Sequence, residues 1–423
     1  MEILKKAILI MKDRYICNNC LGRNFAELGS GLSNQQRGKI IRQFISLLID
    51  SGEKIEIEES NLYGIRFRNV KIKPKKPEKC KICKNFFLDK IDHIADNIIN
   101  KSKGIEFRTF LVGCVPSDEM VRSEEKLWEM AGIEFCEPIK SEINRELGKI
   151  IEMKTDKRFD QKNPDITFVA NLNDNSTKMD VRSLYIYGKY QKLVRGIPQT
   201  KWVCKSCSGK GCVKCKGEGK LYKTSVQEEI EKPFLKVLKG GESSFHGEGR
   251  EDIDARCLGW RPFVLEIKKP KIRKVDLNKI LKIVNRSKKV KIKELKFVDK
   301  SRIKELKFAR VDKTYLARVK FSKKIDRKNL KGLKGLTSVP ILQHTPERVS
   351  HRRAKKIRKR HVKKITWRIK SAKDLEFKIT AESGLYIKEL ITGDNGRTEP
   401  NIAGILENKV KKIELDVIKI HIK

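Results

Sequence analysis

The sequence predicts an α+β protein built from more than one domain, and three features of the chain lead to this fold class. Its 423 residues are enough for two or three domains, each with an apolar core. Helical and strand-like segments alternate between residues 86 and 170. Further along, a polar, glycine-rich turn leads into the apolar run 262–267, which is typical of a buried strand.

The chain is basic along almost its whole length. It carries 97 lysines and arginines against 54 aspartates and glutamates, a formal charge of +43. Such a surface attracts polyanions, so nucleic acid is the first partner to expect, with an affinity that depends steeply on salt. A membrane is the rival polyanion, but no apolar run approaches the ~20 residues that span a bilayer. Nothing indicates an obligate protein partner.

The amino-terminal residues 1–15 bear on location. Their apolar part is too short for a signal peptide, and no small-residue cleavage site follows it. We therefore expect a cytoplasmic protein.

Residues 1 to about 50 are expected to be helical, because apolar positions recur at helical spacing in 3–8 and 40–48. Between these helices, Cys17 and Cys20 form a knuckle-like turn, and a second pair with the same spacing is Cys80 and Cys83. Two thiolates three residues apart can share one tetrahedral ion, so the two pairs predict a four-cysteine zinc site in a module spanning 1–85.

The next segment predicts alternating elements. Helices are expected around 92–99, 124–130 and 139–151, and strands at 107–113 and 165–170. This alternation in a basic region resembles the THUMP-type RNA-binding module, which we assign to residues 50–172, overlapping the zinc module. Another kind of α/β domain would give the same pattern.

Residues 181–202 interleave tyrosines with arginines and lysines. Aromatic faces beside cations are favoured on RNA-binding surfaces, where they stack on bases and pair with phosphates. The alternative is an ordinary strand pair with Tyr185 and Tyr187 on one face.

Two direct copies of C-x2-C-x-G-x-G follow, between Cys204 and Gly219. The glycines allow tight turns in which backbone amides face the sulfurs, so the second predicted zinc site consists of Cys204, Cys207, Cys212 and Cys215. The motif resembles half of the cysteine-rich region of the DnaJ co-chaperones, but the HPD tripeptide of their J-domain is absent. We therefore expect a zinc finger at 202–222, inserted into a larger domain.

Three features of the carboxyl-terminal part are informative. The repeat of Ile292–Phe297 in Ile303–Phe308 is interpreted as a local duplication in surface strands. The basic block 348–364 either follows a phosphate backbone or forms a solvated basic helix. Residues 383–398 predict a strand that turns through Gly384 into the start of a helix.

The polar turn within 245–259 contains four carboxylates, two arginines and three glycines. Asp252 follows Arg250 by two residues and precedes Asp254 by two. On an extended segment all three would share one face, where a guanidinium can keep a carboxylate ionised. The alternative is an acidic turn whose arginines merely satisfy its carboxylates.

These motifs resemble a known family. Gly249–Asp252, Tyr315 in a strand and Gly384–Lys388 resemble the three signature motifs of the pseudouridine synthases. More closely, FHGEGREDIDARCLG, LVRGIPQTKW and YIKELITGDNGRT are similar to the tRNA pseudouridine synthase ten family of archaea and eukaryotes, which modifies positions fifty-four and fifty-five in the T arm of tRNA. The resemblance implies a catalytic domain over 173–423 with a central, mostly antiparallel sheet.

The resemblance also implies the chemistry, which is the isomerisation of uridine to its C-glycoside without an organic cofactor. It makes Asp252 the nucleophile, with Asp254 as the competing candidate. Lys388 and Arg250 would keep the carboxylate anionic, and Tyr315 and Tyr386 would contact the flipped base unless they belong to the core. The alternatives are another THUMP-containing tRNA-modifying enzyme, such as a methyltransferase or a thiolase, and a non-catalytic tRNA chaperone.

Overall fold

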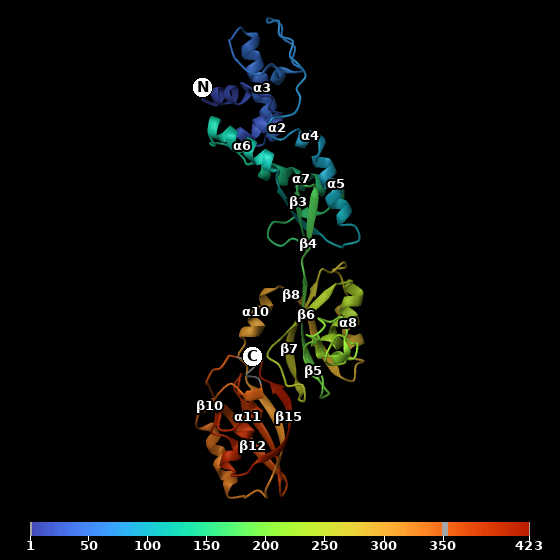
Figure 1. The fold of residues 1–423 in the computed structure, drawn as a ribbon, viewed down its shortest axis with the longest axis vertical. Helices are drawn as coiled ribbons and strands as arrows, with labels where there is room; N and C mark the ends of the chain where they lie inside the picture. Colours follow the sequence, from blue (N-terminus) through green and yellow to red (C-terminus); the bar gives the residue numbers. More distant parts are fainter. Residues whose placement is uncertain (1, 349–353, 423) are drawn as a thin grey trace. The chain divides into compact units, whose positions relative to one another are not determined.

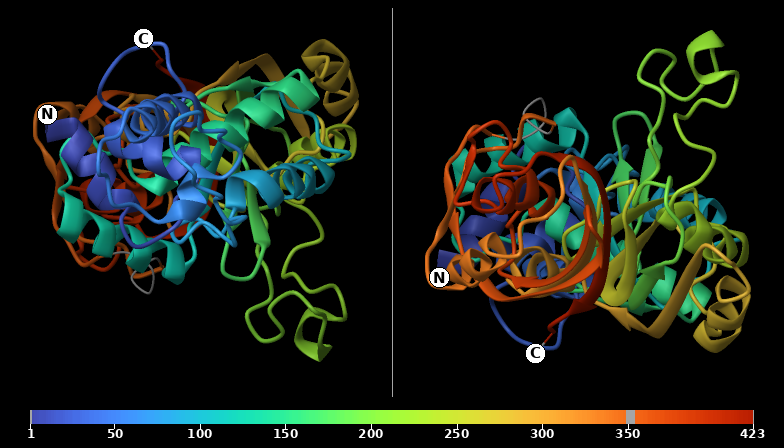
Figure 2. Two further views of the ribbon diagram at one scale, coloured as in Figure 1. Left: turned by 90° about the horizontal axis from the view of Figure 1, so that it is seen from above. Right: turned by 90° about the horizontal axis from the view of Figure 1, so that it is seen from below.

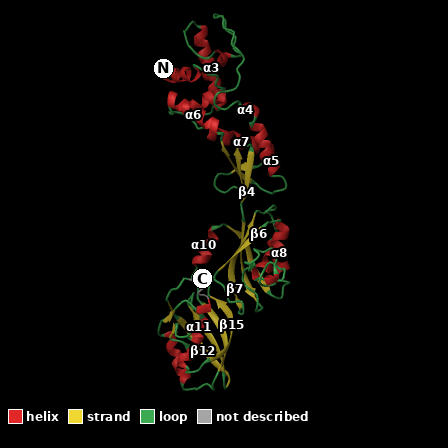
Figure 3. Cartoon of the chain, in the orientation of Figure 1, coloured by secondary structure: helices red, strands yellow, loops and turns green. Residues whose placement is uncertain are grey.

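The computed structural model describes residues 2–348 and 354–422, and the chain divides into two compact units. The first unit ends at Arg182 and the second begins at Ser183. Both combine helices with a sheet, which confirms the α+β class (Figure 1, Figure 3). Within the described residues, no helix is both long enough and apolar enough to cross a bilayer.

The first unit packs its helices and a four-stranded sheet around one apolar core. Its helices are α1 (Glu2–Met11), α2 (Asn18–Gly22), η1 (Arg23–Phe25), α3 (Asn34–Asp50), η2 (Glu59–Leu62), α4 (Phe86–Asp89), α5 (Ile91–Lys101), α6 (Asp118–Ala131) and α7 (Ile139–Thr155). Its strands are β1 (Thr109–Val115), β2 (Arg158–Phe159), β3 (Ile166–Asn171) and β4 (Ser176–Val181). The strand order is β2-β1-β3-β4, and only β3 and β4 pair antiparallel.

The elements expected in this unit are present, but the buried face of α3 differs from the one its apolar spacing suggests. Ile40 and Phe44 are 51% and 53% exposed, whereas Arg42 and Ser46 are buried. Arg42 donates a 2.6 Å hydrogen bond to the carbonyl of Asn61 and a second one to that of Ile16. Because these bonds satisfy backbone acceptors beside the first cysteine pair, the polar face of α3 points inward.

The second unit is built on an eight-stranded sheet in the order β12-β13-β9-β15-β7-β5-β8, with β6 also paired to β7. Its strands are β5 (Leu184–Lys192), β6 (Glu242–Gly247), β7 (Arg256–Lys268), β8 (Val290–Val298), β9 (Lys313–Phe321), β12 (Val362–Ser371), β13 (Asp374–Ala381) and β15 (Val410–Ile420). Only β15 and β7 run parallel, which confirms the expected, mostly antiparallel sheet.

Helices cover both faces of this sheet. The remaining elements are η3 (Val213–Cys215), α8 (Val226–Leu238), α9 (Leu277–Val284), α10 (Ser301–Phe308), η4 (Asn329–Thr337), α11 (Ile387–Thr392), α12 (Ile402–Ile405) and a small antiparallel sheet of β10 (Ile341–Gln343), β11 (Arg358–Arg360) and β14 (Thr398–Glu399). The part of the sheet around β9, β12, β13 and β15 is curved (Figure 2). The segment with η3 projects from the unit as an irregular loop (Figure 2).

The apolar run 262–267 lies within β7, as expected for a buried strand. Phe263 and Leu265 pack in the core that also contains the apolar faces of α8 and α9. Val264 points to the opposite face, where it packs with Ile303 and Leu306 of α10. Because helices cover both faces of β7, its sequence is continuously apolar instead of alternating.

The prediction of a duplication in surface strands is wrong, because the two copies fold differently. Residues 292–297 lie in β8, but 303–308 form most of α10. In β8 the residue Glu294 has a φ of 57°, at a register irregularity that lets Ile292 and Leu295 pack in the same core. In α10 the same three-residue spacing puts Ile303 and Leu306 on one helix face.

The basic block divides in a similar way. Residues 349–353 lie outside the described residues, so this part of the prediction has no structural account. Residues 358–360 form β11, and β12 begins at Val362, so the alternative of a basic helix is wrong for this part of the block.

The two halves of the sheet meet at a short parallel junction, where Asp416 of β15 pairs with Arg256 of β7. The Asp416 carboxylate accepts hydrogen bonds from Arg256 Nε at 3.1 Å and Nη2 at 2.7 Å, and Arg195 Nη2 lies 2.7 Å away. Burial raises the pKa of Asp416, but the bonds from Arg256 and the charge of Arg195 outweigh it, so the net pKa is below its ordinary value.

We predict that Asp416→Asn lowers the free energy of unfolding of the second unit by about 2 kcal/mol, the low end for a buried ion pair because both arginines are about one-third exposed. Since the folded pKa is depressed, this stabilisation is present above the unfolded pKa of about 3.9 and is lost as the pH falls through the folded value. Denaturant unfolding at neutral and acidic pH measures both effects. Glu414→Gln, on the same strand but with a side chain that is 40% exposed, is the control and should change stability little. Equal stability of Asp416→Asn and the control would contradict the prediction.

Candidate active site

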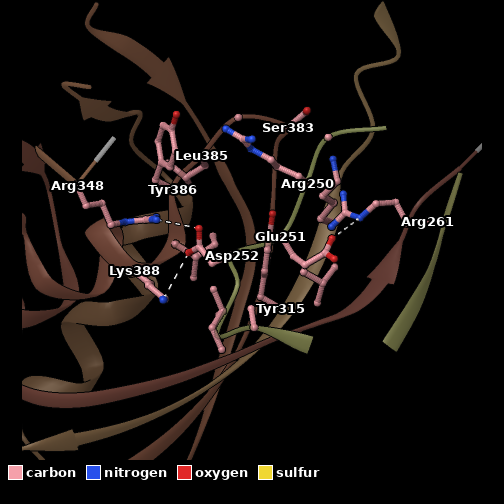
Figure 4. Close-up of a pocket in the computed structure, with 17 residues that line it drawn as sticks. Arg250, Glu251, Asp252, Arg261, Tyr315, Arg348, Ser383, Leu385, Tyr386 and Lys388 are labelled. Atoms are coloured by element: carbon pink, nitrogen blue, oxygen red, sulfur yellow. Dashed lines mark hydrogen bonds and ion pairs between the residues drawn. The ribbon is translucent and has the colours of Figure 1, made fainter. Parts of the chain in front are cut away.

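The loop 248–255 between β6 and β7 forms one wall of a cavity of about 230 Å³. Tyr315 reaches this cavity from β9, and Tyr386 and Lys388 reach it from the start of α11 (Figure 4). Segments more than 100 residues apart in the sequence thus meet beside Asp252. The predicted turn through Gly384 into a helix is confirmed, and it brings the last two side chains to the cavity.

Two cations hold the Asp252 carboxylate. Arg348 Nη1 donates a 2.8 Å hydrogen bond to Oδ1, and Lys388 Nζ lies 3.5 Å from Oδ2 (Figure 4). Arg348 is itself fixed by Glu389, a 3% exposed side chain that accepts from Nε at 2.5 Å and from Nη2 at 3.3 Å. The carboxylate of Asp252 is therefore held in place by side chains that are themselves fixed.

Asp254 is a second, more exposed carboxylate on the same loop. Lys388 Nζ donates to its Oδ1 at 2.8 Å and its Oδ2 at 2.7 Å, so this amine lies closer to Asp254 than to Asp252. Partial burial raises the pKa of Asp254, but the bonds and charge of Lys388 outweigh it and lower the pKa. The side chain of Asp254 is nevertheless 64% exposed, against 27% for Asp252.

The loop is not the extended segment that the sequence suggested. The amide of Ala255 donates a 3.1 Å hydrogen bond to the carbonyl of Asp252, which closes a turn over Ile253 and Asp254. This turn lets both aspartates reach Lys388 even though they are not on an extended strand face.

A buried charge network lies beneath the loop. Arg261, 1% exposed, has its Nε 3.1 Å from a carboxylate oxygen of Glu251 and donates from Nη1 to the carbonyl of Glu248 at 2.8 Å. The Glu248 carboxylate accepts a 2.9 Å hydrogen bond from Lys313, which is also buried. These paired groups fix the backbone on which Asp252 is carried.

Residues 181–202 support the same loop. Lys192 is fully buried in β5, and its Nζ donates to the carbonyls of Ile197, Asp252 and Ile253 at 2.8–3.0 Å. Burial lowers the pKa of Lys192. Gln199 Nε2 donates to the carbonyl of Gly249 at 3.0 Å. The strand interpretation of this segment is correct for 184–192, which form β5, and the buried cation of this strand supports the loop that carries Asp252.

The two predicted base-contacting tyrosines both line the cavity. Burial raises the pKa of Tyr315 to about 12, so its phenol stays protonated at neutral pH. Two guanidinium groups lie close to the ring of Tyr386, with the Cζ of Arg348 5.9 Å and that of Arg358 5.8 Å from its centroid.

The structure thus brings together all five residues that the sequence suggested for the site, since Arg250 lines the cavity as well. Sequence reasoning missed the roles of Arg348, Glu389 and Lys192. In the sequence, Arg348 is the first residue of the basic block 348–364. The signal that could have distinguished it from the rest of the block is the polar, proline-containing segment just before it.

The amino-terminal cysteines converge as expected. The sulfurs of Cys17, Cys20, Cys80 and Cys83 all lie within 4.8 Å of one another, and those of Cys17 and Cys83 are 3.5 Å apart. Four thiolates around one zinc, with Zn–S about 2.3 Å, lie about 3.8 Å from one another. The amide of Cys17 donates to the Cys80 sulfur at 3.3 Å, and Arg23 donates to that of Cys20 at 3.0 Å. This cluster can hold a tetrahedral metal ion.

The second cysteine cluster consists of Cys204, Cys207, Cys212 and Cys215, with sulfur separations of 3.7–3.9 Å for three of its pairs. The amides of Gly211 and Gly219 donate to the sulfurs of Cys207 and Cys215, each at 3.2 Å, which confirms the expected role of the knuckle glycines. Both glycines have positive φ, and a Cβ at either would lie within 2.6 Å of a carbonyl oxygen.

Comparison with known proteins gives matches in both units. Residues 185–421 match the family model "Pus10, C-terminal", and residues 94–171 match "Pus10 THUMP domain, archaeal". The chain is 39% identical to the tRNA pseudouridine synthase Pus10 of Methanothrix thermoacetophila, over 99% of this chain and 94% of that protein. It is 40% identical to that of Methanocaldococcus jannaschii, over 100% and 95%.

A solved structure described as a Cbf5-Nop10-Gar1 complex is similar at 16% identity, covering 54% of this chain and 47% of that chain. The TM-score of 0.29 is too low for this likeness to define the fold.

The two family models and the relatives that are 39–40% identical to the chain make this protein a pseudouridine synthase, an enzyme of the isomerase class. The matches over nearly the full length are more specific. The chain belongs to the Pus10 family of tRNA pseudouridine synthases.

Proposed function

We propose that the protein converts uridine to pseudouridine in the T arm of tRNA, at position fifty-four, fifty-five or both, with Asp252 as the nucleophile. The observation that carries the proposal is the Asp252 carboxylate, which borders the cavity while bound by Arg348 and approached by Lys388. The reaction needs a carboxylate nucleophile beside the target nucleotide, and the two cations hold this carboxylate at the edge of the cavity.

The reaction needs no net gain or loss of atoms or electrons. The bond between N1 of the base and C1′ of the ribose breaks, and a bond between C5 and C1′ forms. The hydrogen that leaves C5 is replaced by one gained at N1. The carboxylate of Asp252 attacks either C1′ or the pyrimidine ring, and it is released when the C-glycoside has formed.

Exposure and position favour Asp252 over Asp254. The Asp252 side chain is 27% exposed and lines the cavity that contains both tyrosines, whereas Asp254 is 64% exposed and is not among the residues that line it. We assign Asp254 to holding Lys388, whose amine it binds at 2.7 Å.

The cavity suits an extruded uridine. A target base in a folded tRNA must leave its stack, and a flipped base is commonly held between aromatic side chains. Tyr315 and Tyr386 would contact the base here, and Arg250 and Lys388 would face its sugar and phosphate.

The rest of the chain is suited to binding tRNA. The net charge of +43 includes exposed cations along β12, an edge strand, at Lys363, Lys364, Arg368 and Lys370. A row of cations along a strand edge can follow a phosphate backbone. The THUMP domain would bind a second part of the tRNA.

We further propose that both cysteine clusters hold structural zinc. Their sulfur separations fit tetrahedral thiolate ligation, and neither cluster includes a residue of the Asp252 cavity. Zinc would then stabilise the amino-terminal module and the inserted finger and take no part in the isomerisation.

For the nucleophile, we predict that Asp252→Asn abolishes product formation, with a loss of about a thousandfold or more, while tRNA affinity stays within about threefold, because phosphate contacts dominate binding. Mapping pseudouridines on an unmodified tRNA transcript, by carbodiimide labelling or mass spectrometry, measures turnover, and filter binding measures affinity. Asp254→Asn is the matched control and should retain most of the turnover. Normal turnover by Asp252→Asn would remove it from the role of nucleophile.

For the metal sites, we predict two zinc ions per chain by elemental analysis, falling to one in Cys80→Ser and to one in Cys212→Ser. Because structural zinc supplies folding free energy, Cys80→Ser should destabilise the amino-terminal module. Cys114→Ser, outside both clusters, should keep both ions. An immediate loss of turnover on chelation without any loss of structure would show instead that a metal takes part in the chemistry.

A further inference from the structure

A second cavity of about 260 Å³ lies against the same loop. It shares several lining residues with the first cavity: Arg250, Glu251, Asp252, Arg348 and Lys388. Residues 250–252 of the loop thus border both cavities, and three cations are common to them. The second cavity is similar in size to the first, and the isomerisation proposed above does not use it.

Trp202 distinguishes the second cavity from the first. It lines the second cavity together with residues 198–200. Trp202 is half-buried and packs edge-on against Tyr222, with ring centroids 5.5 Å apart and an interplanar angle of 86°. Its indole is therefore supported while part of it still borders the cavity.

We propose that the second cavity binds the nucleobase next to the target uridine, stacked on Trp202. This inference rests on the proposed function. When a uridine is extruded, its neighbour loses a stacking partner, and an aromatic side chain can replace that partner. The phosphate that links the two nucleotides must then cross the wall between the cavities, where Arg250, Arg348 and Lys388 supply positive charge.

The cysteine finger positions Trp202. Leu221 donates its amide to the carbonyl of Trp202 at 2.9 Å, and Val203 forms a β-bridge with Lys220. The amide of Cys204, the first cysteine of the cluster, donates to the carbonyl of Gly219 at 2.9 Å. The backbone pairing that holds the two ends of the finger together therefore begins at Trp202. A folded finger thus fixes the indole beside the cavity.

A cycle of one protein change and one RNA change tests the contact. The tRNA transcript carries an abasic residue beside the target uridine, at the position whose base would occupy the second cavity. On this transcript, kcat/KM of the wild-type protein should be reduced about tenfold. Trp202→Ala should lose about as much on intact tRNA and show no further loss on the abasic one. Trp202→Phe should recover most of the activity, and Trp260→Ala, an aromatic change outside both cavities, should retain the abasic effect. Independent losses that multiply, or no loss in Trp202→Ala, would overturn the proposal.

A binding measurement separates this proposal from the proposed function. With Asp252→Asn as the background, tRNA carrying 2-aminopurine on either side of the target uridine is bound, since 2-aminopurine loses fluorescence when it stacks. One of the two positions should become about twofold brighter when Trp202→Ala is added. If neither brightens, the stacking contact is absent, whatever the turnover. If one position brightens but wild-type protein forms no pseudouridine, the stacking contact on Trp202 is supported and the proposed reaction is contradicted.

The role of the finger is tested with Cys207→Ser. Loss of this ligand should reproduce both the brightening and the lost sensitivity to the abasic residue, while the circular dichroism of the rest of the protein stays unchanged. A Cys207→Ser protein that keeps the full abasic effect would show that Trp202 is positioned without the finger.

Discussion

The ion pair between Asp252 and Arg348 is the interaction on which the site depends. It joins the loop before β7 to the segment before β11, which lies 96 residues away in the sequence. Glu389 holds the other side of the same guanidinium, so one arginine links the loop to α11. The fold brings these segments together because the parallel junction of β15 and β7 places the two halves of the sheet side by side. The cavity with its two tyrosines lies at that meeting point.

The charged side chains that are buried beneath the loop support its backbone. Arg261, Lys313 and Lys192 are all less than 10% exposed, and each binds a carboxylate or a carbonyl of the loop. Burying an ion pair costs desolvation free energy that its attraction often only offsets, so such a network contributes little net stability. Its value is geometric, because it fixes a turn that has no regular secondary structure of its own.

The sequence predicted whatever depends on local pattern. Helical spacing identified α5 and α7, the apolar run identified β7, and cysteine spacing identified both clusters. It failed where distant partners decide the outcome. One copy of Ile-Lys-Glu-Leu-Lys-Phe forms a strand and the other a helix, because the two copies pack against different surfaces. Arg42 of α3 points inward because it donates hydrogen bonds to the backbone carbonyls of Asn61 and Ile16. The roles of Arg348 and Lys192 were missed because Asp252, which both side chains bind, lies 96 and 60 residues away from them in the sequence.

We propose above all that Asp252 acts on an extruded uridine. A crystal structure of the protein bound to a tRNA transcript tests it most directly, by measuring which carboxylate lies nearest the target ribose and base. We predict an oxygen of Asp252 within about 3.5 Å of C1′ or of the pyrimidine ring, with Arg348 still bound to Asp252. A uridine placed against Asp254, or one that never enters the cavity of Tyr315 and Tyr386, would contradict it.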